Sequence, residues 1–110
     1  MTDNDPTLPI REKAASYAEV DEGTACTQSS FKTGGKAFLF IGEQGGRSKA
    51  MLKLNESRDE AAQMAESQPK NYELGSGQWI TLRFTAEEPI PEELWTKWLD
   101  ESYELSRPKK

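Results

Sequence analysis

Five cationic side chains in the middle of the chain have the chemistry to bind phosphates. Between residues 25 and 54 these five cations face a single acid, Glu43, which gives the stretch a local charge of +4. The cations are Lys32, Lys36, Arg47, Lys49 and Lys53. Trp79 and Arg83 follow on a later stretch, and an indole is a flat surface on which an unpaired base can stack. These residue types favour a binding face for DNA or for a protein or peptide partner.

Catalytic chemistry finds little support in the composition. The chain has no histidine, which excludes Ser-His-Asp and Cys-His mechanisms and His-ligated zinc. Cys26 is the single cysteine, and we interpret it as a small apolar packing residue rather than a reactive thiol. The stretch Gly34-Gly35-Lys36 is interpreted as a hairpin turn, because Ala37 stands where a P-loop needs a hydroxyl. We therefore expect no enzyme, no catalytic residue, no metal site and no cofactor.

Acidic residues gather in other parts of the sequence. Residues 87–104 contain seven acids and one lysine, a balance of −6, and residues 1–23 have a balance of −4. Glu19, Asp21 and Glu22 could be compared with a carboxylate site for a hard cation, but they lack the spacing of a metal-binding loop. We interpret them as a solvated surface, with positive charge on the strands and negative charge on the helices.

The size and composition of the chain indicate one small domain. With 110 residues it can form one core, and we expect a disordered start at 1–6, a domain at 7–106 and a basic tail at 107–110. The polar start does not resemble a signal peptide, no apolar run approaches the ~20 residues that span a bilayer, and a lone cysteine suits a reducing compartment. We expect a cytoplasmic monomer that does not contact membranes.

The periodicity of apolar residues predicts the elements that position these side chains. We expect a short helix over residues 7–18, a break at 19–23, strands over 24–32, 36–41, 49–54 and 78–84, and a short extended piece at 72–74. Ser57-Arg58-Asp59-Glu60 fits a capping box at the start of a second helix, and Pro91 begins the last helix. Because glycine turns join the strands, we predict an α+β fold with an antiparallel sheet of four to five strands and helices packed on one face.

Two of the predicted strands alternate in a way that assigns each side chain to a face. Over residues 49–54 and 79–84 the aliphatic and phenylalanine side chains occupy every second position and are predicted to face the core. The other positions are predicted to face away from the core: Lys49, Met51, Lys53, Trp79, Thr81 and Arg83. Trp95 and Trp98 have the spacing of a core-facing helical stripe and are interpreted as packing residues.

Several short motifs, in this order, resemble the MmcQ/YjbR-like family. They are Phe31-Lys32-x-Gly34-Gly35-Lys36-x-Phe38, the strand 49–54, Trp79 at the start of a late strand, and Ser102-Tyr103-Glu104-Leu105 in the closing helix. The resemblance spans Val20 to Leu105. It implies a frataxin-like (CyaY-like) α+β fold in a largely uncharacterised family, for which the arrangement of the sheet suggests DNA binding. Members often carry histidine or asparagine before the late tryptophan, where this chain has Gly75-Ser76-Gly77-Gln78.

These observations lead to one favoured function and two alternatives. The favoured function is DNA binding through a basic and aromatic sheet face, which must act as a local patch because the net charge is −5. The first alternative is a protein-interaction module that uses the same face, and the second is an enzyme that uses paired acids. The same lysines could also serve only to keep the sheet soluble and to prevent pairing at its edges.

Overall fold

A computed structural model describes residues 7–25, 28–44 and 46–107 of the chain. The predicted disordered start at 1–6, most of the predicted tail at 107–110, and Cys26 lie outside the described residues. The elements in chain order are α1 (Leu8–Ser16), β1 (Val20–Ala25), β2 (Gln28–Thr33), β3 (Lys36–Gln44), β4 (Arg47–Lys53), α2 (Arg58–Ser67), β5 (Tyr72–Leu74), β6 (Trp79–Phe84) and α3 (Glu92–Ser106).

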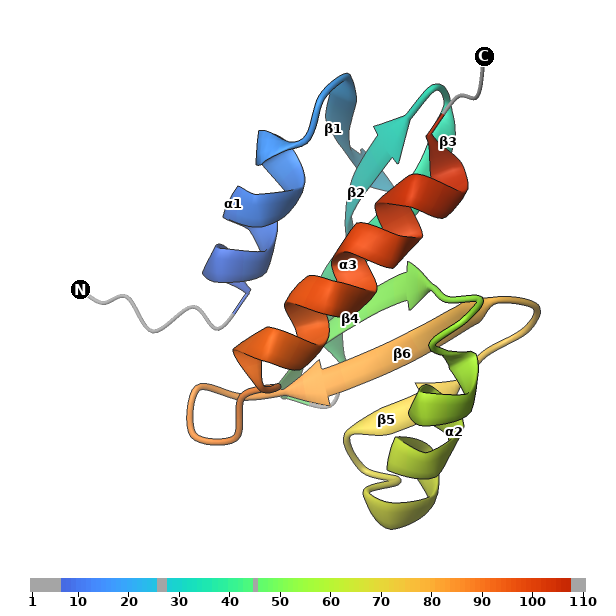
Figure 1. Ribbon diagram of the computed structural model, residues 1–110. Coiled ribbons are helices and arrows are strands. Elements are labelled where there is room, and N and C mark those ends of the chain that lie inside the picture. The colour runs from blue at the N-terminus through green and yellow to red at the C-terminus, as the bar shows by residue number, and fades with distance from the viewer. Residues whose placement is uncertain (1–6, 26–27, 45, 108–110) are drawn as a thin grey trace.

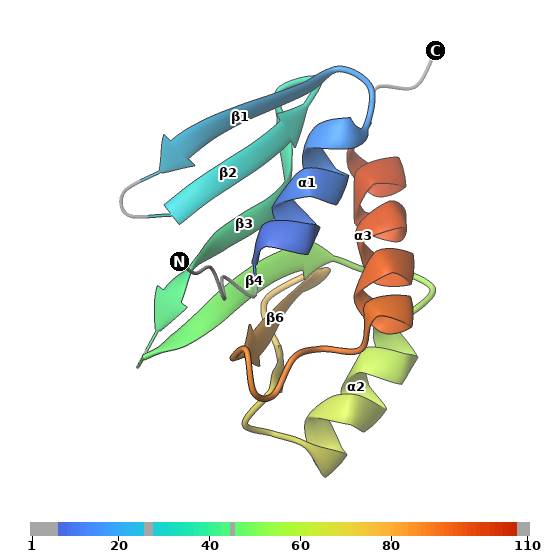
Figure 2. The same cartoon turned by 90° about the vertical axis from the view of Figure 1, so that its left-hand side faces the viewer.

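One open antiparallel sheet is the centre of the fold. Within the described residues it has six strands in the order β1-β2-β3-β4-β6-β5, and every neighbouring pair is antiparallel. Figure 2 shows the three helices on the same side of this sheet. Helix α3 packs across β2, β3 and β4, α1 packs on β1, and α2 packs on β5. The α+β class, the antiparallel pairing and the single helical layer are confirmed, and no helix of the described residues lies on the second face of the sheet.

The predicted strand number was too low because the first hairpin was missed. Residues 19–23 were expected to break the pattern, but β1 starts at Val20 and pairs along its whole length with β2. Asp21, Glu22 and Gly23 are poor strand formers, yet on an edge strand they stay exposed while the ladder with β2 provides their pairing. The break is confined to Glu19, whose φ of 57° turns the chain between α1 and β1.

The alternation of β4 and β6 is confirmed by burial. Ala50 and Leu52 on β4, and Ile80, Leu82 and Phe84 on β6, are all buried against the helices. Trp98 is completely buried and Trp95 is nearly so, which confirms their interpretation as core residues of α3. Among the described residues no helix is both long and apolar enough to cross a membrane.

A serine hydroxyl joins α3 to the sheet at the point where β3 and β4 separate. The β3–β4 ladder ends at Leu39 and Leu52, and the next residues, Phe38 and Lys53, do not continue it. Instead the buried Ser102 hydroxyl donates to the Phe38 carbonyl at 2.6 Å and accepts the Lys53 backbone N–H at 2.8 Å. One side chain thus satisfies two buried backbone groups that would otherwise lack partners.

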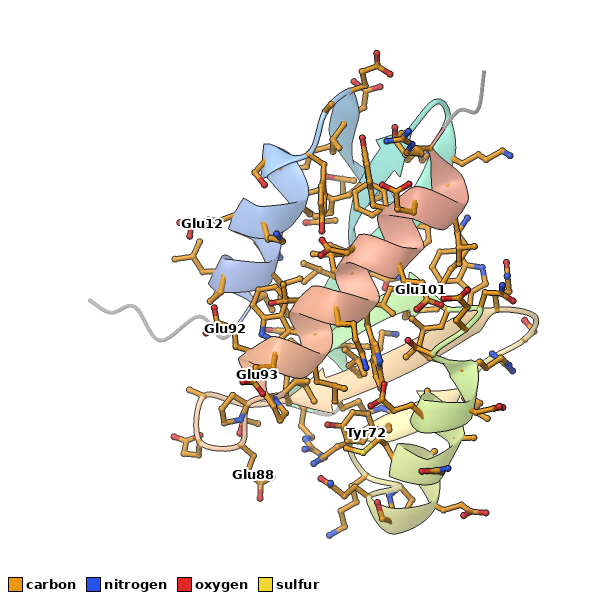
Figure 3. All side chains as sticks on the ribbon, in the orientation of Figure 1. Glu12, Tyr72, Glu88, Glu92, Glu93 and Glu101 are labelled. Carbon is orange, nitrogen blue, oxygen red and sulfur yellow. The ribbon has the colours of Figure 1, made fainter. Side chains whose placement is uncertain are left out.

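The start of α2 is capped from another helix and not by its own capping box. The Ser57 side chain makes no capping hydrogen bond, and Glu60 instead accepts the Trp98 indole N–H at 3.1 Å and pairs with Lys97. The Glu101 carboxylate of α3 accepts the backbone N–H groups of Asn55 at 2.5 Å and Ser57 at 3.2 Å (Figure 3). The capping-box prediction was therefore wrong, because Glu60 binds Trp98 and Lys97, and the Ser57 N–H that it was expected to accept donates to Glu101 instead.

Ser102→Ala tests the bridge between α3 and the sheet. The substitution leaves the Phe38 carbonyl and the Lys53 N–H buried without the hydroxyl, and we expect a loss of about 2–3 kcal/mol in the free energy of unfolding. Urea denaturation followed by circular dichroism measures it, with Ser67→Ala on the exposed side of α2 as the control, for which the change should stay within about 0.5 kcal/mol. Equal losses in both variants would contradict the role of the bridge.

Glu101→Gln tests the cap on α2 through pH. Partial burial raises the pKa of Glu101, but hydrogen bonds from the Ser57 side chain and from backbone N–H groups of residues 55–57 outweigh it and lower the pKa. The carboxylate therefore stabilises the fold above the unfolded pKa of about 4.3, and this stabilisation is lost as the pH falls through the folded pKa. We expect the difference in the free energy of unfolding between wild type and Glu101→Gln, measured by urea denaturation at a series of pH values, to be largest at neutral pH and to vanish on acidification.

Glu12→Gln provides the control for this pH series. Glu12 lies exposed on α1, and its removal takes away the same charge without removing a cap (Figure 3). Its free energy of unfolding at neutral pH should match that of the wild type. A Glu101→Gln gap that persists unchanged at low pH would show that the carboxylate charge is not what stabilises the start of α2.

Candidate functional site

The sheet face opposite the helices carries the side chains that alternation predicted. We call it the outer face, formed by the side chains of β2, β3, β4 and β6 that point away from the helices. The register pairs Lys49 with Arg83, Met51 with Thr81, and Lys53 with Trp79, so all six lie side by side on neighbouring strands. None of the six is fully buried. The prediction that these residues share one face is confirmed.

The centre of the outer face is apolar and aromatic. The rings of Phe40 on β3 and Trp79 on β6 reach across β4, with 5.4 Å between their centroids and 41° between their planes. Phe40 lies opposite Met51 in the register, so the side chain of Met51 adjoins the pair. Both rings are half-buried, which leaves part of each available to a ligand.

Sequence reasoning missed Phe40 as a member of this face. It lies in a continuous apolar run, in which alternation is hard to read. An irregularity in the β2–β3 register leaves Phe38 unpaired with β2, and both Phe38 and Leu39 are buried. From Leu39 onward the alternation is regular, because Leu39 and Ile41 are buried and Phe40 between them is not. Only this short signal could have identified it.

Two lysines of β4 flank the aromatic pair and form no ion pair. Neither Lys49 nor Lys53 pairs with a carboxylate of the residues that the structure describes. The Lys53 ammonium lies over the Trp79 ring, with 5.6 Å between Nζ and the ring centroid. Partial burial, followed by the charge of nearby Lys36, lowers the pKa of Lys53. Lys36 is exposed at the start of β3, and its charge adds to that of Lys53.

The two arginines contribute less charge to the outer face than the sequence suggested. Arg83 forms an ion pair with Glu73 of β5, which neutralises it. Arg47 donates to the Asn71 side chain at 2.7 Å and lies 3.6 Å from a Glu88 oxygen. Both guanidinium groups therefore contact the part of the chain around β5 and α3. Their guanidinium groups hold β5 and the loop before α3 against the sheet. Among the described residues, Lys49 and Lys53 form no such ion pair.

Lys32 extends the positive charge toward the edge of the sheet. It is exposed on β2, between the buried residues Phe31 and Thr33, so it points to the outer face. Its register partner on β1 is Asp21, which reduces its contribution. The structure therefore brings together Lys49, Lys53 and Trp79, with Lys36 near by, and places Lys32 at the margin.

Gln28 of β2 packs its side chain against β3 on the outer face. The side chain of Gln28 covers Gly42, where a Cβ atom would lie 2.8 Å from the Gln28 Cγ. Its Oε1 atom is buried and has no hydrogen-bond partner among the described residues. Gly42 thus lets a β2 side chain lie flat over β3. Sequence reasoning had no signal for this contact.

The two acidic stretches noted in the sequence lie on different elements of the described structure. Glu92 and Glu93 lie in the first turn of α3, and Glu88 lies in the loop before it (Figure 3). Asp21 and Glu22 are exposed on the edge strand β1, and Glu19 precedes it. In the described part of the chain, no three acidic or thiol side chains come close enough together to hold a metal ion.

Comparison with known proteins agrees with this architecture. The sequence model described as YjbR matches residues 15–105. Protein DR2400 of Deinococcus radiodurans, which has a domain described as DUF419, superposes with a TM-score of 0.69 at 19% identity, covering 87% of this chain and 74% of that one. A Pseudomonas syringae protein superposes with a TM-score of 0.60 at 13% identity, covering 90% of this chain and 97% of that one. No curated protein matches the sequence.

Trp79→Phe tests the exposure of the indole on which the site depends. Trp79 is half-buried, whereas Trp95 and Trp98 are buried, so Trp79 should supply the emission that acrylamide quenches. We expect Trp79→Phe to lose most of the quencher-accessible fluorescence and Trp95→Phe to retain it. If both variants quench like the wild type, Trp79 is not the accessible indole and the outer face is arranged differently.

Proposed function

We propose that this chain, which belongs to the YjbR family, binds DNA through its outer face. The observation that carries the proposal is that Lys49 and Lys53, which form no ion pair with the described residues, lie on either side of half-buried aromatic rings. The helices of the described residues lie on the other side of the sheet, and these side chains are not fully buried. Phosphates require cations and bases provide π surfaces, and the outer face offers partners for both.

The charge distribution supports a local rather than a global attraction. The whole chain has a net charge of −5, so it does not attract DNA at long range. The lysines of the outer face must therefore act at short range, where they replace counterions on the phosphates. We expect binding that is weak at physiological salt and much stronger at low salt.

We propose binding without catalysis. Perturbed titratable groups often mark active sites, but those of this protein mostly have structural partners on the helical side of the sheet. The pKa of Glu60 is lowered by its hydrogen bonds with Lys97 and Trp98, and burial and the Asp100 hydrogen bond raise the pKa of Tyr17. Of the described residues whose pKa shifts, only Lys53 lies on the outer face. A lysine over an indole suits a binding face.

Three further properties belong to the same proposal. We propose that the protein acts as a monomer, because the outer face would be covered if two copies associated through it. We propose a cytoplasmic location, because a chain with a single cysteine suits a reducing compartment. The frataxin-like label stays a prediction that follows from the family resemblance.

The apolar centre of the outer face favours one alternative. Phe40, Met51 and Trp79 together form the kind of surface that a protein partner covers, and such a protein-interaction module would not need the lysines. The two functions differ in their response to salt. Binding of DNA weakens steeply as salt rises, whereas an association driven by apolar contacts does not.

Charge reversal on β4 tests DNA binding. We expect Lys49→Glu with Lys53→Glu to abolish the binding of short fluorescent single-stranded and duplex DNA, measured by anisotropy at low salt, because phosphates would meet carboxylates. Lys13→Glu with Lys97→Glu is the matched control, since it changes the net charge equally on α1 and α3 and should bind within about threefold of wild type. Absence of binding by the wild type at low salt would reject DNA binding, and equal losses in both double variants would reject the outer face as its site.

A further inference from the structure

We propose, on the basis of the DNA-binding function above, that the outer face selects unpaired nucleotides. A base stacks on the indole of Trp79 and displaces the ammonium of Lys53, which then contacts the neighbouring phosphate. The inference names the form of DNA and assigns separate tasks to two residues. It extends the proposed function, which by itself requires only contacts to phosphates.

The arrangement around Trp79 supports the exchange. One side of the indole is occupied by Lys53, whose Nζ lies 5.6 Å from the ring centroid, and Phe40 contacts the ring at a tilt of 41°. Phe40 belongs to the packed sheet, whereas the ammonium stands at the end of a flexible side chain. Stacking of a base on an aromatic ring is stronger than an exposed contact between an ammonium and a ring. A base can therefore replace the lysine, and the released cation gains a phosphate partner.

The position of the site disfavours duplex DNA. Trp79 and Phe40 lie on β6 and β3, with β4 between them and further strands on both sides. Four strands at about 4.8 Å spacing make a surface broader than the major groove, which is about 12 Å wide. In a duplex the bases also stack on each other, so only a single strand can present a free base face to the indole.

The acidic surroundings favour a short contact. Glu73 pairs with Arg83 at one edge of the outer face, and Asp21 faces Lys32 toward the other. The free lysines between them, Lys49 and Lys53, are four residues apart on β4, a separation of about 13 Å. This span matches a few nucleotides of single strand. Beyond this span the cations are offset by Glu73 and Asp21, so the outer face offers little further positive charge for the denser charge of a duplex.

Three DNA probes of equal length test the inference by fluorescence anisotropy at low salt. They are an oligothymidylate of about twelve nucleotides, an abasic strand of the same length and a duplex of the same length. We expect the oligothymidylate to bind roughly 5- to 100-fold more tightly than the abasic strand, because only the former offers bases for stacking. We expect the duplex to bind more weakly than the oligothymidylate.

Variants at position 79 assign this preference to the indole. Trp79→Leu keeps an apolar side chain on β6 but removes the flat ring. This variant should bind the oligothymidylate and the abasic strand equally tightly. Trp79→Phe should restore most of the preference, and Tyr17→Leu, which removes an aromatic ring on the helical side, should leave the preference unchanged. Circular dichroism verifies that each variant is folded. The wild type should also lose indole emission when the oligothymidylate binds, and Trp79→Phe should not.

The salt dependence tests the movement of the lysine. Lys53→Gln and Lys49→Gln should each reduce the slope of log K against log salt by about 0.7, the value for one phosphate contact with a single strand. An unchanged slope in Lys53→Gln would overturn the exchange of the ammonium to a phosphate.

The outcomes separate the two proposals. If the wild type binds the abasic strand or the duplex as tightly as the oligothymidylate, selection of unpaired bases is overturned and DNA binding stands. If Trp79→Leu retains the preference, Trp79 is not the stacking residue and the inference is overturned as well. If none of the probes binds, the proposed function itself fails.

Discussion

The hydroxyl of Ser102 is the contact on which the rest of the structure depends. It lies between the Phe38 carbonyl and the Lys53 N–H, where the ladder between β3 and β4 stops, and it attaches α3 to the centre of the sheet. Because α3 is held on this side, it packs across β2, β3 and β4, and the three helices of the described residues all lie on this side of the sheet. The residue whose backbone is held in this way, Lys53, carries the side chain that lies over Trp79. Core packing and the candidate site are thus connected through one residue.

The outer face has a different charge from the rest of an acidic molecule. The sequence predicted a site of six cations and one tryptophan. In the structure, Glu73 and Glu88 form ion pairs with the two arginines. Lys49 and Lys53 form no ion pair with the described residues. Lysines on a sheet also keep it soluble, but that role does not require them to flank an aromatic pair. The proposed binding face rests on this combination of Lys49 and Lys53 with the aromatic pair of Phe40 and Trp79.

Strands with one buried face could be predicted from the sequence, and elements held by distant partners could not. The residues of β4 and β6 alternate, and a one-residue shift would have placed Lys53 and Trp79 in the core, so their faces follow from periodicity alone. Strand β1 was missed because its acids and glycine have low strand propensity, and only the pairing with β2 makes it a strand. The cap on α2 was misassigned for a similar reason. Glu101, far along the chain, accepts the Ser57 N–H that the Glu60 side chain was expected to accept.

By itself the sequence determined the α+β class, the glycine turns, the core stripe with Trp95 and Trp98, and the membership of Lys49, Lys53 and Trp79 in one face. These properties depend on the period of apolar residues, which is local information. Only the tertiary structure decided which cations remain unpaired, that Phe40 meets Trp79 across β4, and that Ser102 takes the place of a ladder hydrogen bond. Ion pairs and ring contacts depend on distances between side chains that are remote in sequence, and those distances exist only once the sheet has paired and α3 has packed on it.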